Sequence, residues 1–272
     1  MANYHSDEWV MNRLQEHYDD VLSQYPEDRI VGIFCYGSTN YNIDIESSDI
    51  DSKVILLPSW DEIIKVGTPI STTRIRPNGD HIDLKDIRLM FDMFKKQNIN
   101  FLEILFTKYR ILNPRYAKFW EKIETNRELI ARYNPYQALT TMRGMAYSRY
   151  KLMKAYSDDP KACRKQAAHI VRLRDFIYRY DKEVSYAECL VPSNIDYIID
   201  IRTGKYDLTT VKTVANRMLD DIDDLYAIKT ATGYNSDVEN IMNDVISDIL
   251  KNYFNDYFWV VQIISNQQCC AR

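Results

Sequence analysis

Residues 34–51 read FCYGSTNYNIDIESSDID, and this stretch decides how the rest of the chain is interpreted. It begins inside an apolar, β-branched and aromatic run at residues 29–36, which predicts a buried strand. Gly37 and Ser38 end that run, because glycine permits the sharp turn that a strand needs to stop. Such a turn can bring backbone N–H groups and a hydroxyl close to phosphate. Gly37 and Ser38 are therefore candidate phosphate contacts.

Two carboxylates follow, separated from Ser38 by ten residues. Asp49 and Asp51 stand at the head of a second predicted strand, residues 50–57. Alternate residues of a strand share a face, so both side chains should point the same way. Neighbouring like charges repel unless a cation neutralises them, and Mg²⁺ prefers one or two carboxylates together with phosphate oxygens. The spacing predicts a phosphoryl- or nucleotidyl-transfer site with two Mg²⁺ ions, for which Mn²⁺ can substitute.

A third carboxylate would complete such a site. Asp83 lies between two apolar residues in a short predicted strand at 81–85, so its flanks should face the core and its carboxylate the site. Asp80 is the competing candidate for this role. Asp86 fits better as a helix cap.

The pattern along the chain divides it into two units. Residues 7–24 have helical periodicity, the three predicted strands follow, and almost only helix signals occur from residue 86 onward. The expected fold class is α+β, with a small mixed-sheet domain at 1–110 and an all-helical domain at 111–272 that closes a cleft against it.

Composition excludes several classes of protein. Of the 272 residues, 46% are hydrophobic and 27% charged, which is typical of a folded chain. No run reaches the 18 apolar residues of a membrane span, and the five cysteines have neither disulfide nor zinc spacing. We therefore expect a cytoplasmic protein that does not contact a membrane. The 21 tyrosines and few glycines suggest an A/T-rich genome of bacterial or phage origin.

Charge is distributed unevenly over the helical unit. Residues 143–182 hold 11 Lys and Arg against 4 Asp and Glu, a net charge of +7. Residues 183–256 hold 6 against 14, a net charge of -8. The overall net charge of -4 therefore conceals a basic stretch that could bind a polyanion.

The ordered motifs resemble the DNA polymerase β-like nucleotidyltransferase superfamily. Within it the chain is most similar to the predicted bacterial and phage nucleotidyltransferases, whose motif reads approximately G-S-x-x-Y/H-G…S-D-x-D. Here residues 37–42 are GSTNYN and residues 48–51 are SDID, so Asn42 replaces the usual second glycine and Ser48 occupies the motif serine. The resemblance is strong up to about residue 105 and looser afterward, where KQAAHIVRL at residues 165–173 continues it.

The resemblance implies transfer of a nucleoside monophosphate from an NTP such as ATP to a hydroxyl acceptor, with Mg²⁺ as cofactor. It implies that Asp49 and Asp51 bind both metals, and that Asp83 binds one and helps to deprotonate the acceptor. Gly37, Ser38 and Ser48 would belong to the nucleotide site. The acceptor stays open among an RNA 3′ end such as tRNA, a protein hydroxyl and a small molecule.

Two predicted helices supply candidate contacts to the triphosphate. On the helix that Pro160 opens, Lys165 and Arg172 share the polar side with Lys161, and His169 lies nearby. We expect Lys165 and Arg172 to bind phosphate without being part of the core. On the preceding helix the candidate nucleotide contacts are Tyr147 and Lys151, which share a face by i, i+4 spacing.

Other classes of function compete with this interpretation. A toxin–antitoxin-type binding module would keep the fold and act by binding its partner. A helical ribonuclease would use Arg164 and His169, although these positions lie about 140° apart on an ideal helix. The aromatic segment at residues 253–261 is most simply helix packing, and it is also a candidate homodimer contact.

Overall fold

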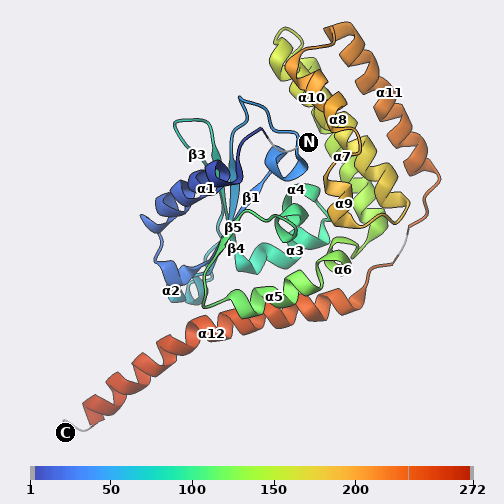
Figure 1. Cartoon of the computed structure of the whole chain (residues 1–272). Helices are drawn as coiled ribbons and strands as arrows, with labels where there is room; N and C mark the ends of the chain where they lie inside the picture. Colours follow the sequence, from blue (N-terminus) through green and yellow to red (C-terminus); the bar gives the residue numbers. More distant parts are fainter. Residues whose placement is uncertain (1–3, 232, 270–272) are drawn as a thin grey trace.

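A computed structural model describes residues 4–231 and 233–269, with side chains up to residue 255. A mixed sheet with its covering helices forms one part of the molecule, and a bundle of longer helices packs beside it (Figure 1). The predicted α+β class, a small mixed-sheet unit followed by helices, is confirmed.

The sheet has five strands in the order β3-β4-β2-β1-β5. Strand β2 is antiparallel to β1 and parallel to β4, while β3 and β5 are antiparallel edge strands. The strand bounds are β1 Ile30–Tyr36, β2 Asp51–Leu56, β3 Ser71–Ile75, β4 His81–Asp86 and β5 Arg110–Leu112. The three strands predicted from sequence, at 29–36, 50–57 and 81–85, are confirmed as β1, β2 and β4.

The sequence patterns missed the two edge strands. Strand β3 is mostly exposed and reads STTRI, so it lacks the apolar alternation that marks a half-buried strand. Strand β5 has only three residues, which is too short for a periodic signal. Both strands are formed by pairing with longer neighbours rather than by their own composition.

Helix α1 (Asp7–Leu22) covers one face of the sheet. Its buried residues Val10, Leu14 and Val21 pack with Ile33 and Val54 in one core cluster. The opposite face packs against the helices that follow β4, where the ring of Phe34 stacks on that of Trp120 at 4.6 Å. Because β1 is buried on both faces, it reads as a nearly continuous apolar run, IVGIFCY.

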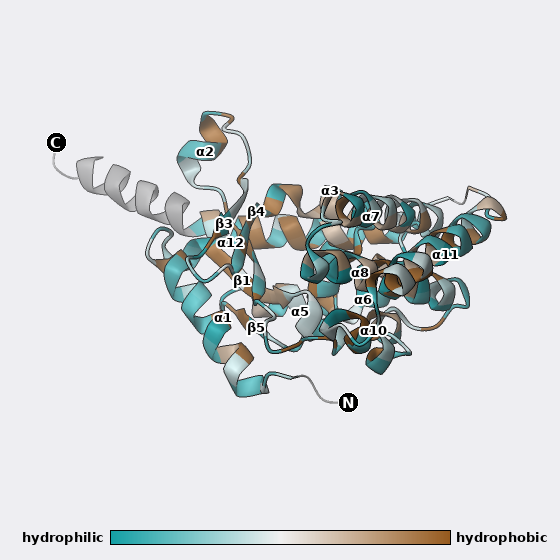
Figure 2. Ribbon diagram, turned by 90° about the horizontal axis from the view of Figure 1, so that it is seen from above, coloured by the Kyte–Doolittle hydropathy of each residue, from teal (hydrophilic) through white to brown (hydrophobic). Residues whose placement is uncertain are grey.

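Several helical elements connect and extend the two parts of the molecule. Helix α2 stands away from the body in Figure 2. The bounds are α2 Trp60–Ile64, α3 Met90–Lys95, α4 Ile99–Leu102, α5 Ala117–Thr125, α6 Arg127–Ala131, α7 Pro135–Ala155, α8 Pro160–Asp181, α9 Tyr186–Leu190, α10 Ile195–Thr203, α11 Leu208–Ala227 and α12 Ser236–Cys269.

Helix α8 is the centre of the bundle and contacts α7, α10 and α11. It begins as predicted, because the Asp159 carboxylate accepts hydrogen bonds from the N–H groups of Lys161 and Ala162 and Pro160 occupies the first turn. The side chains of α8 that face α7 and α10 lie at the junction with the sheet, which is where the candidate site forms.

Helix α12 runs beside α5 and continues past the sheet part (Figure 1). Tyr253 and Phe254 are buried in the core of the chain, in agreement with helix packing. The side chains of residues 256–261 lie outside the described part, and the homodimer contact stays a prediction. Among the described residues, no helix combines the length and the apolar character needed to cross a bilayer.

One hydrophobic cluster extends from Val31 in β1 to Phe254 in α12. The last sheet strand, β5 Arg110–Leu112, also spans the residue at which we placed the boundary between units. The predicted domain division at residues 110/111 therefore stays a prediction. The hydrophobic core is continuous between the two parts of the molecule.

Candidate active site at the junction of sheet and helices

The turn after β1 has the backbone conformation that its sequence predicts. Gly37 has φ 99°, a value that side chains with a Cβ rarely adopt. A 3₁₀ turn, Ser38–Tyr41, follows, and Asn42 ends it in the left-handed region at φ 55°. Asn42 thus does here what the motif glycine would do, since Asn tolerates positive φ. Gly37 and Ser38 both line a cavity between the sheet and the helices, called the cavity from here on.

A buried carboxylate that we did not predict holds this turn in place. Glu103 is 0% exposed and accepts hydrogen bonds from the Gly37 N–H at 2.9 Å, the Asn40 side-chain amide at 3.1 Å and the Tyr41 hydroxyl. Burial raises the pKa of Glu103 above its usual value. The Gly37 N–H donates its hydrogen bond to Glu103 and is therefore not available to a phosphate. The expected phosphate contact at Gly37 then depends only on how closely a residue without a side chain lets a phosphate approach the backbone.

Asp49 and Asp51 both line the cavity, as their spacing predicts, while the intervening Ile50 is 1% exposed and points into the core. Asp51 Oδ1 accepts from the backbone N–H of His81 at 3.2 Å and is 2.8 Å from Nδ1 of the same residue. Burial and the neighbouring charge of Asp49 raise the pKa of Asp51, against the lowering effect of His81. A cation bound between two such neighbouring carboxylates would offset their mutual repulsion.

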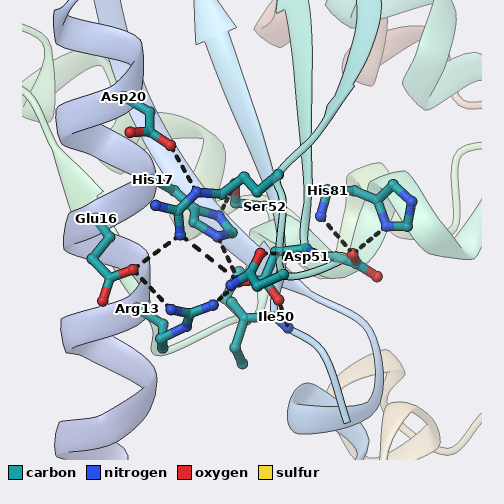
Figure 3. Close-up of polar contacts among 12 residues, drawn as sticks. Arg13, Glu16, His17, Asp20, Ile50, Asp51, Ser52 and His81 are labelled. Atoms are coloured by element: carbon teal, nitrogen blue, oxygen red, sulfur yellow. Dashed lines mark hydrogen bonds and ion pairs between the residues drawn. The ribbon is translucent and has the colours of Figure 1, made fainter.

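Asp49, Asp51 and His81 form a group that fits a divalent cation. Each offers one ligand atom, and these atoms all lie within 4.8 Å of one another. Figure 3 shows His81 beside Asp51, on the side of the strand away from the buried His17 and Ser52. The sequence patterns missed His81 because its place depends on which residue of β4 lies beside Asp51 in the parallel pair.

Asp83 lines the same cavity, but its carboxylate is already paired. Its Oδ2 lies 2.8 Å from the Lys53 ammonium, and its other oxygen accepts from the Thr73 hydroxyl. Although burial alone would raise the pKa of Asp83, Lys53 and Thr73 hold it below its usual value. The metal role predicted for Asp83 would require this ion pair to open.

Asp80, the competing candidate, lies outside the cavity. It is 3% exposed and accepts from Arg13 at 2.5 Å, from the Ile50 N–H at 3.1 Å and from Asn78, with His17 Nε2 3.1 Å away (Figure 3). These partners occupy its oxygens and tie α1 to the peptide between the two site aspartates. Asp86 caps the 3₁₀ turn that follows β4, as predicted.

Positive side chains from three helices face these carboxylates across the cavity. Lys165 is half exposed, and its Nζ is 3.9 Å from Asp49 Oδ2. Sequence analysis identified Lys165 and Arg172 on α8 but missed Arg149 on α7 and did not assign a role to Arg202 on α10, although all four line the cavity. Burial lowers the pKa values of Arg149 and Arg202, which indicates how strongly this wall is desolvated.

Arg172 differs from its prediction in one respect. It is 2% exposed and its guanidinium lies over the ring of Tyr41, 3.8 Å from the centroid, so it is part of the packed interior. The expectation that it lies outside the core is wrong, because α10 and the turn at residues 38–41 cover this side of α8. Its Nε and Nη1 are buried and have no hydrogen-bond partner among the described residues. Two such donors in a cavity wall suit an anionic ligand.

His169 lies in the same wall and lines the cavity. Desolvation, followed by the charges of Arg149, Arg172, Arg202 and Lys165, holds the pKa of His169 well below its ordinary value. Its imidazole is therefore neutral at pH 7, and it can donate a hydrogen bond to phosphate from one ring nitrogen only.

Other predicted nucleotide contacts lie away from the cavity. The Tyr147 hydroxyl bonds to Asp223 on α11, and Lys151 is exposed to solvent. Ser48 is buried, where its hydroxyl accepts from the Ile45 N–H at 2.9 Å and from Arg202 at 3.2 Å. Ser48 therefore fixes the loop before Asp49, and a direct contact to nucleotide from these three residues would require rearrangement.

The pair proposed for a ribonuclease is separated. Arg164 donates to the carbonyl of Tyr206 at 3.3 Å, at the end of the bundle near Gly204, while His169 faces the cavity. Helix phase predicted this separation.

The assembled cavity has a volume of about 410 Å³. Its sheet side supplies the cation-binding group Asp49, Asp51 and His81, and its helical side supplies four cationic residues and His169. A ligand that carries both a bound cation and several negative oxygens would satisfy both sides together.

No protein-family profile matches the sequence, and no curated protein matches it. A nucleotidyltransferase-like protein from Exiguobacterium sibiricum superposes on the structure with a TM-score of 0.30. The match has 8% sequence identity and covers 80% of this chain and 74% of that one. A similarity this low supports no argument about function, so the proposal below depends on the geometry of the site.

Proposed function

We propose that the protein is a metal-dependent nucleotidyltransferase that moves a nucleoside monophosphate from an NTP to a hydroxyl acceptor. The observation that carries the proposal is the single cavity in which Asp49 and Asp51 face a cationic wall, with Lys165 3.9 Å from Asp49. Carboxylates alone would suit a cation, and arginines alone would suit an anion. Their meeting in one cavity suits the complex of a metal ion with a triphosphate.

Each side of the cavity has a distinct part in this reaction. Asp49 and Asp51 would hold the divalent cation, which when bound stabilises negative charge on the phosphate oxygens. Lys165 and Arg172 would hold the triphosphate, with Arg149 and Arg202 adding charge from the neighbouring helices. Ser38 would contact the phosphates from the turn that Glu103 stabilises. Most of the catalysis would then come from positioning and electrostatics.

The transfer step is a displacement at phosphorus. The acceptor oxygen forms a bond to the α-phosphorus, the bond from that phosphorus to the bridging oxygen breaks, and pyrophosphate leaves with the electron pair. The hydroxyl proton passes to a carboxylate of the cavity.

Radiolabel transfer tests this proposal. The protein is incubated with each NTP, labelled either at the α- or at the γ-phosphorus, with Mg²⁺ or Mn²⁺, and is offered total RNA, a protein mixture and a small-molecule extract as three acceptor pools. The proposal predicts that α-label enters one acceptor pool and γ-label enters none, and that Asp49→Asn abolishes the transfer. Transfer that survives Asp49→Asn, or no α-label in any pool with any NTP, would contradict it. Shortened RNA would instead support the ribonuclease hypothesis.

A further inference from the structure

We infer that the metal centre is completed by the imidazole nitrogen of His81 and not by a third carboxylate, so that it binds Mn²⁺ in preference to Mg²⁺. The inference rests on the proposed function for the presence of a metal centre in this cavity. Compared with the sequence motif, the third ligand is a histidine in place of an aspartate, and its donor atom is nitrogen in place of oxygen. The preferred metal is Mn²⁺ in place of Mg²⁺.

The strand register explains why an imidazole takes this place. In the parallel pair of β2 and β4, Asp51 lies opposite His81 and Lys53 lies opposite Asp83. Residues 51 and 53 point to the same face, as do residues 81 and 83. The neighbour of the metal-binding Asp51 is therefore a histidine, and the third carboxylate is one pair further along the sheet, beside a lysine.

The ion pair at Asp83 works against metal binding there. Lys53 is 5% exposed, its Nζ is 2.8 Å from Asp83, and the same ammonium lies 3.4 Å from the centroid of the Tyr36 ring. A divalent cation on Asp83 would come close to this buried ammonium. It would also remove the anion that neutralises Lys53, and a buried charge without a partner is strongly unfavourable.

His81 is in the opposite situation. Its ring lines the cavity and its Nδ1 is 2.8 Å from Asp51 Oδ1, next to Asp49. The candidate ligand atoms of the three residues lie within 4.8 Å of one another. Ligands of one ion with bonds of about 2.1 Å lie roughly 3–4 Å apart, so small side-chain rotations would bring the group around a cation. In the contact with Asp51 the Nδ1–H donates to the carboxylate oxygen, and the imidazole would present its Nδ1 lone pair to a cation in the tautomer that carries the proton on Nε2.

Donor chemistry then sets the selectivity. Mg²⁺ prefers oxygen ligands and gives up its waters reluctantly. Mn²⁺ also suits carboxylates, but as a first-row transition-metal ion it accepts an imidazole nitrogen more readily than Mg²⁺ does. Two carboxylates, one imidazole and the phosphate oxygens of a nucleotide form a mixed nitrogen and oxygen shell. Such a shell favours Mn²⁺ over Mg²⁺ more than the three-carboxylate shell that the sequence motif implies.

Pulsed electron paramagnetic resonance of Mn²⁺ bound to the full chain tests the ligand directly. We expect coupling from a directly bound ¹⁴N in the parent protein and its loss in His81→Gln, with Mn²⁺ binding weakened about tenfold or more. His169→Gln is the matched control, because His169 lines the same cavity on the helical side. This control should keep the coupling. Absence of the coupling in the parent, or its survival in His81→Gln, would overturn the inference, as would failure of the parent to bind Mn²⁺.

A second variant keeps the test decisive if His81→Gln does not fold. His81→Asp restores a three-carboxylate shell, and the ratio of the Mg²⁺ to the Mn²⁺ dissociation constant should fall about tenfold relative to the parent. An unchanged ratio would overturn the inference. Mn²⁺ bound through His81 without nucleotidyl transfer would reject the proposed function alone, whereas transfer by a metal centre without ¹⁴N coupling would reject this inference alone.

Discussion

At the scale of single residues, the charged groups of the site are incompletely paired within the protein, so that a bound ligand would balance their charges. Asp51 has a raised pKa beside Asp49, and Arg172 has two buried donors without partners among the described residues. By contrast, the structural groups around them, Asp80 and Glu103, have their oxygens occupied by protein donors. This difference separates the residues that hold the fold from those that we expect to hold a ligand.

Asp51→Asn tests the electrostatic cost of the carboxylate pair. The pKa of Asp51 is raised, so its charged form is disfavoured in the native state, and its contribution to stability is lost as pH rises through that pKa. At pH 7 the metal-free variant should therefore be more stable to unfolding than the parent, as measured by urea denaturation. It should also lose nucleotidyl transfer. A variant that unfolds more easily without metal would mean that Asp51 is primarily structural.

His169 gives a prediction about pH. Its pKa is well below the ordinary value, so between pH 6.5 and that lowered pKa the unfolded chain binds a proton that the native chain does not. Stability should fall as pH decreases through this interval, by at most about 1.4 kcal/mol per pH unit for one proton. His169→Gln should flatten this part of the curve in urea denaturation from pH 7 to 5. Equal slopes in parent and variant would show that burial and the four neighbouring cations do not lower the pKa of His169.

At the scale of elements, α8 connects the packed interior of the bundle to the cavity. Its helical period predicted Lys165, His169 and Arg172 on neighbouring parts of one face, and all three line the cavity. Its depth in the molecule was not predictable, because the period of one helix does not reveal which elements cover it. Arg172 is therefore buried where an exposed contact was expected.

Lys165→Ala should separate ligand binding from stability. Loss of one charge-assisted contact to phosphate weakens triphosphate affinity about 10- to 150-fold. The Lys165 side chain is half exposed, so the thermal midpoint should stay close to that of the parent. Lys161→Ala is the matched control, because it is an exposed lysine on the same helix, one turn from Lys165. Equal affinities of the two variants for the triphosphate would remove Lys165 from the binding site.

At the scale of the whole molecule, local patterns predicted what is local in the chain. The turn at Gly37, the shared face of Asp49 and Asp51, and the helix start at Pro160 each follow from a few consecutive residues. The remaining features depend on how distant segments meet.

His81 and Lys53 take their roles from the register of a parallel strand pair, and Glu103 from a hydrogen bond across 66 residues to Gly37. The phase of α7 relative to α8 selects Arg149 for the cavity and directs Tyr147 to α11. No periodicity within one segment contains that information. The sequence motif therefore predicted individual residues on the sheet side of the cavity in more detail than on the helical side.

Calorimetric titration of the intact protein with a non-hydrolysable NTP, with and without Mn²⁺, tests the central claim most directly. If sheet and helices bind the two halves of one metal–triphosphate complex, Mn²⁺ should strengthen nucleotide binding at least about tenfold in the parent. That gain should disappear in Asp49→Asn, whereas Lys165→Ala should weaken binding both with and without Mn²⁺. Nucleotide affinity that is independent of Mn²⁺ in the parent, or unchanged in both variants, would contradict the account.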